Sequence, residues 1–87
     1  MDYFRLTWAV GNEEKRDIFD CEHRYEVLGS REAIFDLWFH LSQLEELAKQ
    51  RLHASACPRF LTIVDKNGIP QEPRHGLQAL VNEGTYQ

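Results

Sequence analysis

Apolar residues recur at helical spacing between Ser30 and Leu52, and this is the strongest pattern in the chain. They fall three and four residues apart, as on one face of an α-helix, and Ser30 supplies the side-chain oxygen that caps a helix N-terminus. The pattern predicts one long amphipathic helix whose apolar band is centred near Leu41. The positions are Ala33, Ile34, Leu37, Trp38, Leu41, Leu44, Ala48 and Leu52.

Phe35 and Phe39 lie one turn apart on this helix and well to one side of the apolar band. In a domain of this size, a wide core or the chain termini would cover the two rings. Alternatively, they form a partner-binding patch, because aromatic side chains bury a large area at little cost in entropy. The sequence leaves both interpretations open.

Two segments before the helix alternate between apolar and polar residues, the period of a half-buried strand. They run from Tyr3 to Val10 and from Asp17 to Val27, and they predict an antiparallel hairpin. Alternate residues of a strand share a face, so the second segment should carry an acidic row on its solvent side. That row consists of Asp20, Glu22 and Glu26, interrupted by Arg24.

The chain after the helix predicts a third strand and a tight turn. Pro58 disfavours helical geometry at the preceding residue, and the β-rich run from Phe60 to Val64 follows it. Asn67-Gly68 indicates a reversal, after which Ile69 adds at most a short edge strand. Spaced apolar residues between Gly76 and Asn82 predict a short helical segment. The sequence says little else about residues 69–87.

The elements define an α+β fold, a single small domain spanning residues 1–87 in the order β-β-α-β. A right-handed crossover through the helix places the third strand beside the first, in the order 2-1-3. The helix then packs on a three-stranded or, with Ile69, four-stranded sheet that is mainly antiparallel. Binding is expected on the open sheet face or at the exposed edge of the second strand.

The 87 residues carry a net charge of −4 that is unevenly spread. Residues 1–48 hold eleven acidic and five basic side chains, whereas residues 49–87 hold three acidic and five basic ones. Without clustered Lys and Arg, duplex DNA is a poor ligand, and a protein partner with a basic surface is a better one. No apolar run approaches the roughly 20 residues of a membrane span, and no signal peptide opens the chain, so we expect a cytoplasmic protein.

Metal and catalytic chemistry have only weak signals. Cys21 and His23, with His53 and Cys57, could supply a Cys2His2 zinc site, but their spacing is not that of a zinc knuckle. Asp36 lies one helical turn from His40, a pair that can orient an imidazole and is also common on surfaces. We expect both cysteines to be reduced, no metal, no cofactor and no enzymatic activity.

The best-supported function is therefore a non-enzymatic protein-binding module that acts stoichiometrically on a larger protein. A small RNA or single-strand binder is the first alternative, because exposed aromatic side chains can stack on unpaired bases. A small homo-oligomeric structural or regulatory protein is the second, with Phe35 and Phe39 forming a homodimer interface. The partner-binding candidates are Phe35, Phe39, Glu13, Glu14, Asp20, Glu22 and Glu26.

In size and architecture the chain resembles the small acidic inhibitors that bacteriophages make against host machinery, anti-CRISPR proteins among them. The elements that carry the resemblance are Tyr3 to Val10, Asp17 to Val27, Ser30 to Leu52 and Phe60 to Val64. Such inhibitors share no residue motif, so no functional residue can be carried over. The resemblance implies that the acidic side chains meet basic residues that the target uses for nucleic acid.

Overall fold

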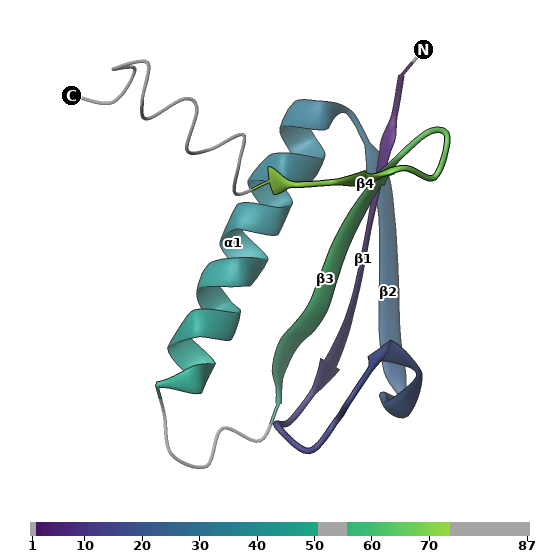
Figure 1. Cartoon of the computed structure of the whole chain (residues 1–87). Helices are drawn as coiled ribbons and strands as arrows, with labels where there is room; N and C mark the ends of the chain where they lie inside the picture. The colour runs from purple at the N-terminus through teal and green to yellow at the C-terminus, as the bar shows by residue number, and fades with distance from the viewer. Residues whose placement is uncertain (1, 51–55, 74–87) are drawn as a thin grey trace, which may run out of the picture.

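The structure, a computed structural model, describes residues 2–50 and 56–73. Its elements are β1 (Phe4–Gly11), a 3-10 helix η1 (Ile18–Asp20), β2 (His23–Gly29), α1 (Arg31–Lys49), β3 (Cys57–Asp65) and β4 (Pro70–Gln71). The four strands form one sheet in the order β2-β1-β3-β4 with every neighbouring pair antiparallel, and α1 packs on one face (Figure 1). The predicted α+β class and the 2-1-3 strand order are confirmed.

The helix begins where the sequence predicts. The Ser30 side chain accepts a hydrogen bond from the amide of Ala33 (3.2 Å), and α1 continues to Lys49. The predicted end at Leu52 lies outside the described residues, as does the predicted helical segment from Gly76 to Asn82.

The core lies between α1 and the two central strands. Leu6 of β1, Ile63 of β3, and Ile34 and Trp38 of α1 form one buried cluster. The buried stripe of α1 continues to Ser42, whose hydroxyl donates to the carbonyl of Phe39 at 2.8 Å.

The buried stripe is thus rotated from the centre predicted at Leu41. Leu41 is only half-buried and Leu44 is 52% exposed, whereas Ser42 is buried. The shift is possible because the Ser42 hydroxyl satisfies its hydrogen bond within the helix and needs no water.

A bulge interrupts the pairing of β1 with β3. Thr7 pairs with Thr62 and Ala9 with Arg59, so β3 carries one extra residue over this stretch. Phe60 lies in the extra stretch with φ of 60°, a conformation that side chains other than glycine rarely adopt. The bulge brings Arg59 opposite Ala9, which is fully buried.

The predicted second strand is wrong in its first half. Residues 18–20 form η1, and β2 begins only at His23. The Asp17 side chain accepts the amides of Phe19 (2.8 Å) and Asp20 (3.2 Å), and the Asp20 side chain accepts the amide of Asp17 (3.3 Å). These local bonds compete with strand pairing. The expected acidic row does not exist, because Asp20 lies in η1, Glu22 precedes the strand, and Glu26 alone is in β2.

The turn between β3 and β4 follows the Asn-Gly signal. The Asp65 carbonyl accepts the amide of Gly68 at 2.9 Å, and the Asp65 side chain accepts the amides of Asn67 and Ile69. Gly68 has φ of 79°, which glycine adopts without strain. The fourth strand is therefore present, but it comprises Pro70 and Gln71 rather than Ile69.

Burial in the core should dominate stability. We expect Leu6→Ala to lower the free energy of unfolding by about 2–5 kcal/mol, because the site is closed on all sides. The matched change Leu44→Ala, at a side chain 52% exposed, should alter it by less than about 0.5 kcal/mol. Urea denaturation measures both, and equal losses would place the core elsewhere.

Candidate functional site

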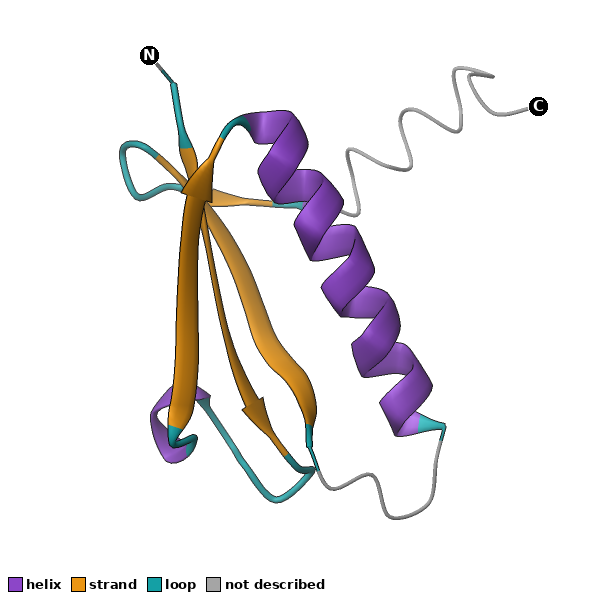
Figure 2. Cartoon of the chain, turned by 180° about the vertical axis from the view of Figure 1, so that it is seen from behind, coloured by secondary structure: helices purple, strands orange, loops and turns teal. Residues whose placement is uncertain are grey.

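Most of the predicted acidic site residues lie in the connection between β1 and β2. We call residues 12–22 the acidic loop; it holds five acidic side chains and two basic ones. In Figures 1 and 2 it lies at the end of the sheet away from the start of α1. Four predicted site residues are brought together in this one segment: Glu13, Glu14, Asp20 and Glu22.

The first half of the acidic loop is held by an arginine from β3. The Arg59 guanidinium donates hydrogen bonds to the carbonyls of Asn12 and Lys15, the latter at 2.6 Å. The Asn12 side chain also accepts the amide of Glu14 at 3.0 Å. Charged donors make stronger hydrogen bonds than neutral ones, so Arg59 fixes the path of this segment.

The second half of the loop is held by η1 and by Cys21. The reciprocal bonds of Asp17 and Asp20 form a capping box, and the Asp20 carboxylate also accepts the amide of Arg16 at 2.9 Å. Cys21 is buried against Gly11, where an added Cβ would lie 3.1 Å from the Cys21 sulfur. A side chain at position 11 would therefore force Cys21 and the Lys15 side chain to shift.

This scaffold presents an aromatic ring to solvent. Phe19, within η1, is 79% exposed, more than any other large hydrophobic residue among those described. The Arg24 guanidinium of β2 lies 5.7 Å from the ring centroid. The predicted strand from Asp17 to Val27 included Phe19, so Phe19 was not among the predicted site residues. The signal that could have found it is the Asp17-x-x-Asp20 spacing, which resembles a capping box.

The two helix phenylalanines occupy different environments. Phe35 is half-buried and packs against the core, with its ring edge-to-face with Phe4 at 5.9 Å and the Arg31 guanidinium 5.1 Å from its centroid. Phe39 is 37% exposed, and its ring meets that of His40 at 5.9 Å. The two rings do not form a paired exposed patch, although a partner contact at Phe39 stays a prediction.

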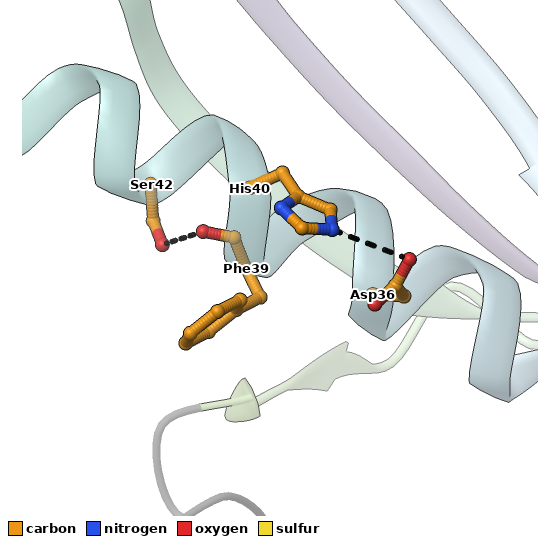
Figure 3. Close-up of polar contacts among 4 residues, drawn as sticks. All are labelled: Asp36, Phe39, His40 and Ser42. Carbon is orange, nitrogen blue, oxygen red and sulfur yellow. Dashed lines mark hydrogen bonds and ion pairs between the residues drawn. The ribbon is translucent and has the colours of Figure 1, made fainter.

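The candidate catalytic pair is a contact between two exposed side chains of α1. His40 Nε2 lies 3.6 Å from Asp36 Oδ2, and both side chains are largely exposed. Figure 3 shows the Ser42 hydroxyl directed to the Phe39 carbonyl rather than to the imidazole. The four residues drawn there do not form the hydrogen-bonded nucleophile and base that covalent catalysis needs.

The candidate metal ligands do not assemble in the described part of the chain. Residues 2–50 and 56–73 contain no group of three or more His, Cys, Asp or Glu side chains that could hold a metal ion, and His53 lies outside them. Cys21 and Cys57 are free thiols. Burial, and secondarily the negative charge of Glu45, raises the pKa of Cys57 above its ordinary value. A high thiol pKa disfavours the thiolate that binds metals.

α1 carries a hollow of about 500 Å³ lined by Ser42, Gln43, Glu46 and Leu47. None of the predicted site residues lines it. Among the described helices, none is both long and apolar enough to cross a membrane.

Comparison of the chain with protein-family models, with curated proteins and with solved structures gives no match. The acidic loop must therefore be interpreted from its own features: a backbone held by hydrogen bonds, an exposed ring, and exposed carboxylates in the same segment.

The role of Arg59 in holding the acidic loop can be tested by removing its hydrogen-bond donors. We expect Arg59→Met to lower the free energy of unfolding by about 1–3 kcal/mol, because two carbonyls lose a charged donor. Amide hydrogen exchange at Glu14 and Lys15 should accelerate. Arg5→Met, at an exposed arginine of β1, serves as the matched control. Unchanged amide exchange rates in the Arg59 variant would show that Arg59 does not hold this segment.

The Cys57 thiol should titrate above the ordinary range. Because the thiolate is the reactive form, alkylation of the folded protein should be slow at neutral pH and accelerate only as the pH approaches the raised pKa. Glu45→Gln removes the nearby negative charge and should lower the pKa of Cys57 part of the way, since burial remains. Glu32→Gln, near the start of α1, is the matched control. Equal alkylation profiles for all three proteins would show that Glu45 has no effect.

Proposed function

We propose that this chain is a non-enzymatic protein-binding module that engages a larger protein through the acidic loop. The observation that carries the proposal is the 79% exposure of Phe19 on a segment fixed by the capping box and by Arg59. A large ring held in solvent by a fixed backbone is costly in water and favourable in a partner's pocket. Because the loop is already ordered, binding loses little further entropy.

The charge around Phe19 specifies the kind of partner. Glu13, Glu14 and Glu22 are exposed in the loop, and Glu26 follows on β2. A segment that carries an apolar anchor and several exposed carboxylates complements a basic surface with an apolar pocket, and the charge accelerates encounter with such a surface. Asp20 helps to hold the shape of the acidic loop, because its carboxylate accepts hydrogen bonds from the backbone amides of Arg16 and Asp17.

The specific form we propose is stoichiometric inhibition by occupying a nucleic-acid-binding surface, as the resemblance to phage-encoded inhibitors implies. Basic surfaces that bind phosphates are natural targets for the carboxylates of the acidic loop. The proposal includes a cytoplasmic site of action and requires no cofactor. The resemblance in size and architecture supports this finer form, and the acidic loop supports the broader one.

The proposal is tested by comparing two phenylalanines. The tagged chain is passed through a nuclease-treated extract of its source cells, the captured protein is identified, and its affinity is measured by calorimetry with purified components. Phe19→Ala should weaken binding about 30-fold or more, as expected for a buried aromatic anchor. Phe39→Ala, the same change on α1, should have little effect.

Two further results distinguish the alternatives. Glu13→Lys combined with Glu14→Lys should slow association and reduce its dependence on salt. If Phe39→Ala weakens binding and Phe19→Ala does not, the partner binds α1 and the acidic loop is excluded. If capture depends on nucleic acid and is lost on nuclease treatment, the chain binds an oligonucleotide instead.

A further inference from the structure

One edge of the sheet is open along a full strand. β2 pairs with β1 on one side, and on its other side no strand in residues 2–50 or 56–73 pairs with it. It is seven residues long and contains no proline. The opposite edge is β4, which has two residues and begins with Pro70. Short strands and prolines protect an edge from pairing, so β2 is the edge able to accept another strand.

The helix side of β2 is apolar and uncovered. Tyr25 and Val27 lie opposite Trp8 and Leu6 of β1, on the face that carries the core, yet they are 47% and 37% exposed. Figures 1 and 2 show that α1 runs beside β3, with β2 at the far edge of the sheet. The Tyr25 ring stacks on Trp8, with centroids 5.4 Å apart. An aromatic row therefore runs to the edge of the sheet and ends there.

The face of β2 turned away from α1 carries one positive and one negative side chain, Arg24 and Glu26. They precede and follow Tyr25 along the strand. Two copies of a strand that pair antiparallel about a two-fold axis perpendicular to the sheet keep their faces aligned. An axis through Arg24 or through Glu26 would set like charges directly opposite each other, which is unfavourable. An axis through Tyr25 sets Arg24 of each copy opposite Glu26 of the other.

We propose that β2 pairs with β2 of a second copy of this chain, with the two-fold axis at Tyr25. The pairing makes one continuous sheet with both copies of α1 on the same side, and each copy contributes an Arg24 to Glu26 ion pair. On the helix side the two Tyr25 rings meet and join the two stacks on Trp8. The dimer goes beyond the proposed function, because the acidic loop lies outside the paired strand.

The symmetry gives a test with four proteins. Sedimentation equilibrium of the wild-type chain over a range of concentrations should show the mass rising from 10.2 kDa towards twice that value. Arg24→Glu gives the strand two negative side chains and Glu26→Arg gives it two positive ones. Each single variant alone should dimerise at least tenfold more weakly than wild type, because both facing pairs become repulsive.

Mixing the two single variants should restore association as a heterodimer, since each strand then meets the opposite charges. The variant that carries both Arg24→Glu and Glu26→Arg should dimerise like wild type. Circular dichroism confirms that each variant is folded; if Arg24→Glu is not, Arg24→Gln and Glu26→Gln test the loss of the pairs. A wild-type chain that stays monomeric to millimolar concentration, or single variants that dimerise undiminished, would overturn the proposal. Because Arg24 also lies 5.7 Å from the Phe19 ring centroid, Glu26→Arg is the variant that separates self-association of the purified chain from partner capture through Phe19.

Discussion

The contact between α1 and the two central strands is the interaction on which the rest of the structure depends. Ile34 and Trp38 of α1 bury against Leu6 of β1 and Ile63 of β3. A helix with its side chains is about 10 Å wide, whereas neighbouring strands lie about 4.8 Å apart, so one helix covers about two strands. The four-stranded sheet therefore extends past its cover. The partial exposure of Tyr25 is a direct consequence of this geometry.

The same central pair of strands also determines the acidic loop. The bulge in β3 places Phe60 at φ of 60°, a cost of order 1–3 kcal/mol for a residue that is not glycine. It also sets Arg59 opposite Ala9, from where the guanidinium reaches the carbonyls of Asn12 and Lys15 and lies 4.6 Å from the Phe60 ring centroid. The unfavourable backbone is thus coupled to the bonds that hold the loop. Strain of this kind persists only where surrounding contacts fix it.

The sequence predicts what depends on burial and misses what depends on local polar bonds. The α1 start at Ser30 and the 2-1-3 strand order follow from apolar periodicity and capping. The turn at Asp17 and Asp20 does not, because side chains that bond neighbouring amides leave the alternation of the sequence intact while they bend the chain. The acidic residues of the site could therefore be predicted from composition. Phe19 was missed because its exposure results from that turn, for which the Asp17-x-x-Asp20 spacing is the only sequence signal.

The acidic loop and the open edge of β2 differ in charge. The acidic loop has a net charge of −3, from five acidic and two basic residues, whereas β2 carries one arginine and one glutamate. At about 0.15 M salt, interactions between exposed charges fall off over roughly 8 Å. On the proposed function, the loop attracts a basic partner at its own end of the sheet, whereas within β2 Arg24 and Glu26 balance each other. An edge with balanced charges can meet its own copy even though the chain as a whole is negative.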